Sequence, residues 1–349
     1  MNYPINKVFY LLLISTTLSS IIGWFTIWIA PGIKLIDIPG SSIHKIHHKP
    51  TPITGGIVLI TVLTIISIIF IKEHFQLIWS ILVGSWIVFL FGLWDDLKDL
   101  PAGVKLFGQL IAVTVIINMG IQIHIFNSSE FIFSADKFLD NWVNILFTIL
   151  WILILTNAFN FIDSIDGLAI GLGFISTAFY LIVTLASEQF NLTYFCTIFL
   201  GISISLYYFN TEPAKLFLGD SGSQTIGFIL AAIAITFNPK AVNQMSSWFV
   251  PIIIFGVPLF DISLVILSRI RRNKWIHRPS NDHVYHRLIS YGFYTKRVVL
   301  MLHITSLILC VIGFLCLNID YHLGNIIFFI FLTIGFSFFL FFDYLYSDN

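Results

Sequence analysis

The sequence predicts an all-α polytopic membrane protein, and three observations support this prediction. Of the 349 residues, 57% are apolar and 10% are charged, whereas charged residues make up about 25% of a typical soluble domain. Phenylalanine alone occurs 36 times, and the mean hydropathy is +0.92. Because a soluble protein of this size could not bury so much apolar side chain, the composition excludes a cytosolic globular enzyme, a secreted disulfide-bonded domain and a disordered chain.

Eleven apolar runs predict membrane-spanning helices, each of which needs about 20 mostly apolar residues. They cover residues 7–30, 53–71, 77–94, 102–119, 141–159, 168–186, 191–209, 223–238, 247–269, 298–318 and 324–345. No small-residue cleavage site follows the first run, so we expect a retained span and not a signal peptide. The chain has no internal repeat or low-complexity linker, which favours one integral domain over residues 1–349.

The distribution of Lys and Arg predicts the orientation in the membrane. Connections after odd-numbered runs hold fourteen of the basic residues, whereas the other connections and the amino terminus hold four. We therefore expect the odd-numbered connections and the carboxy terminus in the cytoplasm, and the amino terminus outside. In one external connection, residues 120–140, apolar residues alternate around a polar turn, which predicts a small β-hairpin. The zero net charge does not favour nucleic-acid binding.

Five polar clusters occur in this apolar chain, one in each odd-numbered connection. Ionisable residues at membrane depth are functional candidates, and purely structural polar residues would fall on both faces. The shared location therefore predicts an active site on the cytoplasmic face.

The first cluster contains histidines, among them His47, followed by the sequence PTPITGG. Gly55 and Gly56 at the start of a helix would leave their backbone amides open to an anion. A proline turn followed by a helix start that packs closely through glycine is the alternative.

The second cluster contains Asp95, Asp96, Lys105 and Gln109. Adjacent carboxylates repel one another unless they share a proton or a cation, and Mg²⁺ is the usual cation for such hard oxygen ligands. Helix capping is the alternative, but the carboxy-terminal end of a helix disfavours acidic side chains.

In the third cluster Asn157, Asn160, Asp163 and Asp166 recur at every third residue. On a helix this spacing places their oxygens side by side, where they could ligate a metal, bind a nucleobase edge or form a structural hydrogen-bond network.

The fourth cluster, LGDSGS, contains Gly219, Asp220 and Ser221 at the start of a predicted helix. Small residues before a helix amino terminus are typical of a phosphate-binding loop, and Asp220 could ligate a metal there. Simple amino-terminal capping by Ser221 or Ser223 is the alternative.

The fifth cluster is the basic connection from Arg269 to Arg297, with the sequence HVYHRL. Anionic lipid at the inner leaflet explains several of its basic residues, but it does not explain His283 and His286. Asp261, an isolated acid within the ninth run, has no role that the sequence assigns.

Acidic, amide, basic and histidine side chains of this kind suit phosphoryl transfer between a water-soluble phosphate compound and a lipid phosphate. The sequence has no P-loop pattern and no zinc-type spacing of His and Cys.

Five motifs in order, PTPITGG, DDLKDLPAGVKLFGQ, NAFNFIDSIDGLA, LGDSGS and HVYHRL, resemble the polyprenyl-phosphate N-acetylhexosamine-1-phosphate transferases. The resemblance covers about residues 35–300. It is closest to bacterial undecaprenyl-phosphate GlcNAc-1-phosphate transferases of the glycosyltransferase 4 group, and the phospho-MurNAc-pentapeptide transferases are more distant.

The resemblance implies a multi-pass enzyme of the bacterial inner membrane that depends on Mg²⁺, or on Mn²⁺ in its place. Its partners would be undecaprenyl phosphate, a UDP-N-acetylhexosamine and membrane lipids, and a homodimer stays open. Undecaprenyl phosphate would attack the β-phosphate of the nucleotide-sugar and release UMP. The product would start a lipid-linked envelope glycan, such as O antigen, common antigen or a teichoic-acid linkage unit.

The resemblance also implies roles for individual residues. The metal ligands would be Asn160 and Asp220. The catalytic residues would be Asp95, Asp96, Asp163, Asp166, His283 and His286. The substrate-binding residues would be His47, Lys105, Asn157, Gly219, Ser221 and Arg287.

The chain departs from the family pattern at Tyr285, which replaces a histidine, and at Ser164, which replaces a glycine. Relatives that use rarer N-acetylated deoxysugars also vary in the loop that contains Tyr285, so the sugar is left open. UDP-GlcNAc is the expected donor, with UDP-FucNAc, UDP-QuiNAc or a murein precursor as alternatives. A secondary transporter and an inactive scaffold remain rivals from other classes. A transporter would place its acids near the middle of the membrane, often in repeated halves.

Overall fold

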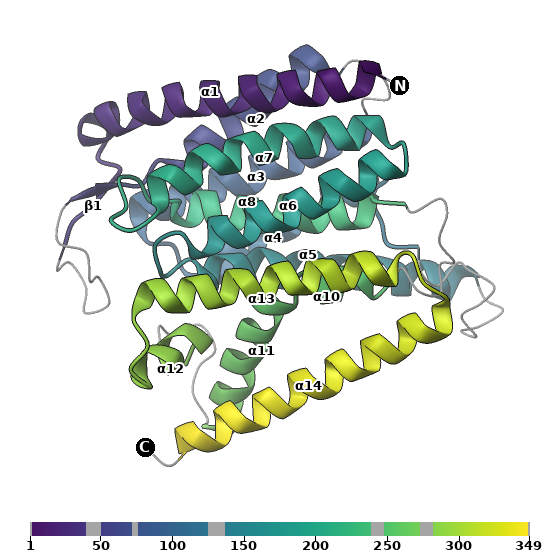
Figure 1. Cartoon of the computed structure of the whole chain (residues 1–349). Helices are drawn as coiled ribbons and strands as arrows, with labels where there is room; N and C mark the ends of the chain where they lie inside the picture. Colours follow the sequence, from purple (N-terminus) through teal and green to yellow (C-terminus); the bar gives the residue numbers. More distant parts are fainter. Residues whose placement is uncertain are drawn as a thin grey trace. The chain divides into compact units, whose positions relative to one another are not determined.

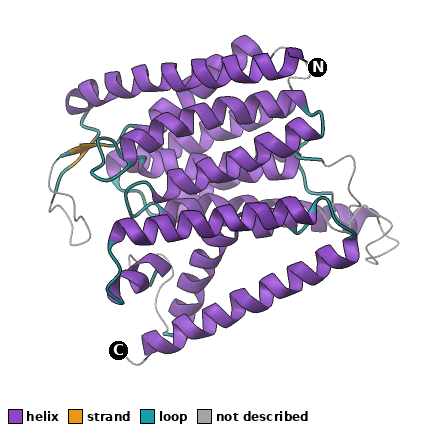
Figure 2. Cartoon of the chain, viewed as in Figure 1, coloured by secondary structure: helices purple, strands orange, loops and turns teal. Residues whose placement is uncertain are grey.

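The computed structural model describes residues 2–39, 50–71, 76–124, 137–238, 248–272 and 282–347. These residues are almost entirely helical (Figures 1 and 2), which confirms the all-α prediction. The chain groups into two compact units: unit 1 comprises residues 1–122 and 147–237, and unit 2 comprises residues 123–146 and 238–349. The single integral domain stays a prediction.

Unit 1 contains most of the helices and the two short strands. Its elements are α1 (Asn2–Ile33), β1 (Ile36–Asp37), β2 (Thr51–Pro52), α2 (Gly55–Phe70), α3 (Gln76–Lys98), α4 (Ala102–Asn118), α6 (Leu168–Ala186), α7 (Phe190–Asn210) and α8 (Gly219–Thr236). The helix α5 (Lys137–Ile162) begins in residues assigned to unit 2 and ends in unit 1.

Helix α8 is the most enclosed element of unit 1. Every residue from Ser221 to Ala234 is buried, and α8 packs along α3 and also contacts α2 and α6. Small side chains make this possible, since a Cβ atom at Gly227 would lie 2.6 Å from the carbonyl oxygen of Leu155 in α5. The polar start of α8 is therefore held inside protein and away from lipid.

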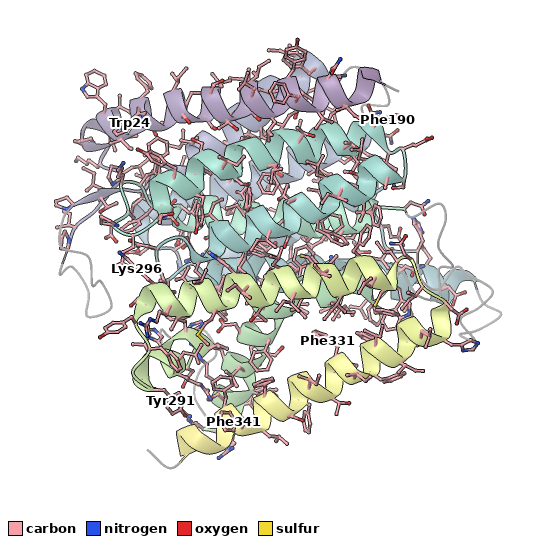
Figure 3. The ribbon with its side chains drawn as sticks, in the orientation of Figure 1. Trp24, Phe190, Tyr291, Lys296, Phe331 and Phe341 are labelled. Carbon is pink, nitrogen blue, oxygen red and sulfur yellow. The ribbon has the colours of Figure 1, made fainter. Side chains whose placement is uncertain are left out.

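The outer helices carry large apolar side chains on their surface. Trp28 of α1 is 77% exposed and Phe336 of α14 (Tyr321–Ser347) is 63% exposed, and Figure 3 shows further side chains of this kind, with Trp24 and Phe341 labelled. Among the described residues, seven helices are long and apolar enough to cross a membrane, and α2 and α4 are shorter apolar helices. The chain is a multi-pass membrane protein, while the count of eleven spans stays a prediction.

A small sheet joins the first connection to the start of α8. Strands β1 and β2 pair antiparallel, with Ile36 opposite Pro52. Beside them Ile53 forms a parallel bridge with Phe217, whose amide donates to the carbonyl oxygen of Pro52 at 2.8 Å. The external hairpin predicted for residues 120–140 falls largely on residues 125–136, which lie outside the described residues.

Unit 2 contains α10 (Val250–Ile254), α11 (Gly256–Arg271), α12 (Val284–Ser290), α13 (Thr295–Cys316) and α14. The ninth apolar run, predicted as one span, is broken between α10 and α11. Pro258 explains the break, because proline has no amide hydrogen to donate to the carbonyl of Ile254, one helical turn earlier.

Candidate active site

The ends of four helices bring the predicted polar residues of unit 1 together. Asp95 and Asp96 lie in the last turn of α3, and Lys105 lies in the first turn of α4. Asn160 lies near the end of α5, and Asp220 lies at the start of α8. Motifs that are far apart in the sequence therefore form one cluster, as their shared location in odd-numbered connections predicts.

Asp96 caps the amino terminus of α8. Its Oδ1 accepts a hydrogen bond from the amide of Asp220 at 2.7 Å, and its Oδ2 accepts one from the amide of Ser221 at 3.1 Å. Gly219 permits this approach, because its φ is +70° and a Cβ atom there would lie 2.7 Å from Asp96 Oδ2. The loop that we expected to hold a phosphate thus already binds an anion, the Asp96 carboxylate.

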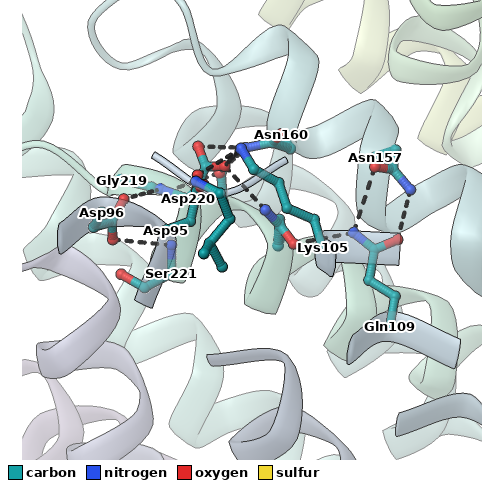
Figure 4. A network of polar contacts seen from close by, with 12 residues as sticks. Asp95, Asp96, Lys105, Gln109, Asn157, Asn160, Gly219, Asp220 and Ser221 are labelled. Carbon is teal, nitrogen blue, oxygen red and sulfur yellow. Dashed lines mark hydrogen bonds and ion pairs between the residues drawn. The ribbon is translucent and has the colours of Figure 1, made fainter. Parts of the chain in front are cut away.

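Lys105 joins Asp95 to Asp220 (Figure 4). Its Nζ lies 2.5 Å from Asp95 Oδ2 and 2.7 Å from Asp220 Oδ2. The other oxygen of Asp95 accepts a hydrogen bond from the amide of Leu100 at 2.6 Å. A cationic group therefore lies between two carboxylates that would otherwise repel each other.

Carboxylate and amide oxygens are the donors that a hard divalent cation prefers, so the chemistry of this cluster fits Mg²⁺. The positions of the side chains fit a bound cation less completely than their chemistry does. Asn160 presents its amide nitrogen to Asp220 Oδ1 and to Ser223 Oγ, both at 3.0 Å. Over the described ranges, no group of three His, Cys, Asp or Glu side chains is arranged to hold a metal. The fit rests on Asp95 and Asp220, which already flank the Lys105 ammonium.

A chain of side-chain amides leads from α5 to Asp220. Asn157 Nδ2 donates to Leu153 O and to Gln109 Oε1, each at 2.8 Å. Gln109 Nε2 donates to Gln224 Oε1 at 3.0 Å, and Gln224 Nε2 donates to Asp220 Oδ2 at 3.1 Å. Because a carbonyl and a carboxylate can only accept, the acceptors at the two ends determine the direction of every bond between them.

Asp163 and Asp166 lie in the segment between α5 and α6. Burial, together with the negative charges of Asp220, Asp166 and Asp96, raises the pKa of Asp163 well above its usual range. Asp166 Oδ2 accepts a hydrogen bond from the amide of Ala214 at 3.0 Å, which ties this segment to the one before α8. A bound cation would relieve the repulsion at Asp163.

The first motif supports the start of α8. The Gly55 amide donates to Phe217 O at 3.0 Å, and the Gly56 amide donates to Leu218 O at 3.3 Å. The expectation that these amides are open to an anion is therefore wrong, and the alternative of a closely packed glycine helix start is the one observed. His47, predicted to bind substrate, lies outside the described residues.

In unit 2, Arg287 is enclosed by protein and is 1% exposed. Its guanidinium donates to the carbonyl oxygens of Asp282 at 3.0 Å and Phe342 at 2.8 Å, and to Ser268 Oγ at 3.2 Å. These contacts join α12 to α11 and α14, so Arg287 has a structural role here. Its predicted contact with substrate stays a prediction.

The two predicted histidines pack against an aromatic ring. His283 is buried and its ring stacks on Tyr285, with centroids 5.2 Å apart and planes 17° apart. His286 is half-buried, and its ring lies 4.3 Å from that of Tyr285. The tyrosine that departs from the expected motif therefore packs against both histidines, whose own ring centroids lie 6.2 Å apart.

Gln109 and Gln224 belong to the site. The sequence placed Gln109 in the second polar cluster without a role and did not single out Gln224, although a signal for both was present. Gln109 follows Lys105 by four residues on α4, and Gln224 follows Asp220 by four residues on α8. Residues four apart share one face of a helix, so each glutamine lies beside a residue that was predicted.

The fold and the carboxylate cluster define an integral membrane protein with an acidic polar site enclosed by helix ends. Residues 78–238, which hold the carboxylate cluster and the chain of side-chain amides, match the model for glycosyl transferase family 4. A probable undecaprenyl-phosphate N-acetylglucosaminyl 1-phosphate transferase of Bacillus subtilis is 30% identical over 283 residues, 80% of this chain and 76% of the relative. The chain belongs to glycosyl transferase family 4.

Two further relatives show the range of this similarity. A decaprenyl-phosphate N-acetylglucosaminephosphotransferase of Mycobacterium tuberculosis is 28% identical over 74% of this chain and 70% of its own length. A phospho-N-acetylmuramoyl-pentapeptide-transferase of Clostridium novyi is 28% identical over 80% of this chain and 86% of its own length.

Proposed function

We propose that this protein transfers a hexosamine 1-phosphate from a UDP-N-acetylhexosamine to undecaprenyl phosphate at the cytoplasmic face of the bacterial inner membrane. UMP leaves, and the lipid-linked sugar starts an envelope glycan. The observation that carries the proposal is the cluster of Asp95, Asp96, Asp220 and Lys105, formed by helix ends in a chain whose outer helices carry exposed apolar side chains.

The charge of the cluster favours phosphate chemistry that depends on a divalent cation. Asp95, Asp96, Asp163, Asp166 and Asp220 would repel a phosphorylated substrate by themselves. Asp95 and Asp220 would hold Mg²⁺, with Asn160 beside them after its amide group has turned. When bound, Mg²⁺ would act as a Lewis acid that neutralises charge on the transferred phosphate.

The protein's own residues position the reactants. Lys105 would exchange a carboxylate for a substrate phosphate, since its ammonium already lies between the carboxylates of Asp95 and Asp220. A general base has little proton to remove, because a phosphomonoester has its second pKa near 6 and is mostly dianionic at pH 7. We therefore assign most of the acceleration to positioning and charge neutralisation.

The names of the relatives support N-acetylglucosamine as the sugar. Two of the three relatives described above are named for that sugar and one for N-acetylmuramoyl-pentapeptide. We therefore rank UDP-GlcNAc first among the candidate donors, followed by UDP-FucNAc, UDP-QuiNAc and the murein precursor.

The test measures UMP release by purified protein with undecaprenyl phosphate, Mg²⁺ and each of these four donors. Mass spectrometry of the lipid fraction identifies the product. We expect release with one donor, dependent on both the lipid phosphate and Mg²⁺, and abolished by EDTA. Folded protein that releases no UMP with any donor would overturn the proposal and leave transport or an inactive scaffold.

A further inference from the structure

Asn210 is a buried amide that the proposed chemistry does not use. It is the last residue of α7 and is 2% exposed. A polar side chain at this depth is costly unless hydrogen bonds satisfy it. Its partners therefore indicate why the amide is there.

The two polar atoms of Asn210 bind the backbone of two different segments. Nδ2 donates to the carbonyl oxygen of Leu216 at 3.0 Å, and Oδ1 accepts a hydrogen bond from the amide of Gly167 at 3.0 Å. Because a carbonyl oxygen only accepts and a backbone amide only donates, these partners determine the orientation of the side chain. Asn210 thus joins the segment before α6 to the segment before α8.

The two segments that Asn210 joins carry acids of the candidate active site. Asp163 lies in the segment before α6, and the other segment leads into the first turn of α8, which holds Asp220. The negative charge of Asp220 is one of the causes that raise the pKa of Asp163, so the two carboxylates are close enough to repel each other. A contact that holds the two segments together opposes this repulsion.

The backbone on both sides of the link is well supported. Gly167 precedes α6 with a φ of +79°, in the left-handed region that favours glycine. On the other side, the segment before α8 is held by the bond from the Phe217 amide to Pro52 O at 2.8 Å. Asn210 therefore attaches the Asp163 segment to a part of the fold that β2 already holds in place.

We propose that Asn210 is a positioning residue that holds the Asp163 segment against the start of α8, so that the carboxylates of Asp163 and Asp220 stay within reach of one divalent cation. The inference rests on the proposed function for its ligand. The side chain of Asn210 binds backbone at both polar atoms, so it acts on the cation through the two acids. A cation between the acids would replace their repulsion by attraction.

Three variants separate positioning from packing. Asn210→Leu keeps the size of the side chain and removes both bonds, whereas Asn210→Asp keeps an oxygen for the Gly167 amide and places its second oxygen against Leu216 O. The matched control is Thr193→Val. The Thr193 hydroxyl donates to Thr184 Oγ1 at 3.2 Å and links the same two helices, α6 and α7, at their opposite ends.

The first readout is hydrogen exchange measured by mass spectrometry, in detergent with EDTA. We expect faster exchange at residues 163–168 and 211–218 in Asn210→Leu, faster exchange only at residues 211–218 in Asn210→Asp, and wild-type exchange at both in Thr193→Val. Unchanged exchange at residues 163–168 in Asn210→Leu would overturn the inference without any metal or substrate.

The second readout is the binding of Mn²⁺, used in place of Mg²⁺ and measured by electron paramagnetic resonance of the free ion. A residue that orients metal-binding groups typically changes metal affinity about 10–100-fold. We therefore expect Kd to rise about tenfold or more in Asn210→Leu and to stay unchanged in Thr193→Val. Asn210→Ser, whose side chain is too short to reach both partners, is a second variant with the same expected effect.

Equal Mn²⁺ affinity in Asn210→Leu and the wild type would show a purely structural link and contradict the inference. An equal loss of affinity in Thr193→Val would also contradict it, because the effect would then come from general destabilisation. Wild-type protein that binds no Mn²⁺ would overturn it as well.

The kinetics of UMP release separate this inference from the proposed function. The Mg²⁺ concentration that gives half the maximal rate should rise about tenfold in Asn210→Leu, with a smaller change in the rate at saturating Mg²⁺. An unchanged Mg²⁺ requirement would contradict positioning. Wild-type protein that binds Mn²⁺ but releases no UMP would instead refute the proposed function, while the exchange and Mn²⁺ results for Asn210 would still stand.

Discussion

At the scale of single residues, Lys105 determines the charge balance between Asp95 and Asp220. Its ammonium contacts both carboxylates within 2.7 Å. Lys105→Met should therefore leave the two acids facing each other without a cation. In EDTA we expect the free energy of unfolding to fall by about 1–3 kcal/mol, less than for a fully buried pair because Lys105 is partly exposed. Mg²⁺ should then stabilise Lys105→Met more than the wild type, as measured by thermal unfolding in detergent.

The matched control for this change is Lys98→Met, because Lys98 is exposed in the last turn of α3. Its response to Mg²⁺ should equal that of the wild type. An equal Mg²⁺ response in Lys105→Met and the wild type would show that the metal does not bind where the lysine lies.

Gln109 and Gln224 act through Asp220 and do not contact reacting atoms in our account. Gln224→Met removes the hydrogen bond to Asp220 Oδ2, and Gln109→Met removes the donor that orients the Gln224 amide. A hydrogen bond to a charged group contributes about 1.5–3 kcal/mol, so Gln224→Met should lower kcat/KM about tenfold or more, and Gln109→Met, which loses bonds to neutral amides, should lower it less. The double variant should lose about as much as Gln224→Met alone, because Gln109 acts on Asp220 through Gln224.

Kinetics of the four proteins in this double-mutant cycle measure the coupling. Gln76→Met, at the exposed start of α3, controls for the substitution itself and should be fully active. Losses that add in the double variant would mean that the glutamines act separately.

At the scale of elements, close packing between helices α3 and α8 positions the site. A Cβ atom at Gly92 of α3 would lie 2.6 Å from the Cα of Ser221 in α8. Because the neighbour is backbone, Gly92→Ala must push the two helices apart. We expect a loss of about 1–3 kcal/mol in stability and a further loss of activity, as Asp96 moves away from the α8 amides.

Gly103→Ala is the matched control, since a Cβ atom at Gly103 meets nothing within 4 Å. Its thermal stability should be unchanged or slightly raised, because alanine favours a helix over glycine. Equal melting temperatures for Gly92→Ala and the wild type would contradict the close approach of α3 and α8.

At the scale of the whole molecule, the sequence predicted the helices more completely than the contacts between them. Each apolar run coincides with a helix or, for residues 247–269, with the pair α10 and α11. Apolar runs and prolines are local signals, so they can be recognised without the fold. The convergence of Asp95, Lys105 and Asp220 was also foreseeable, because charge bias placed their connections on one face.

What the sequence could not reveal depends on contacts between distant segments. The sequence LGDSGS is compatible with a phosphate-binding loop and with a helix start that Asp96 caps. Which of the two forms depends on how closely Gly92 and Gly219 let α3 and α8 approach each other. The partner of Asp261 could not be predicted from the sequence either, because His283 lies 22 residues away, at the start of another helix.

The most direct test of the central claim, that the carboxylate cluster of unit 1 is the active centre, compares UMP release by Asp220→Asn and Asp320→Asn. The exposed Asp320 caps the start of α14 and accepts a hydrogen bond from the His322 amide at 2.9 Å. We expect Asp220→Asn to release UMP at least about 100-fold more slowly than the wild type, and Asp320→Asn to match the wild type. Folded Asp220→Asn protein with the wild-type rate would contradict the claim.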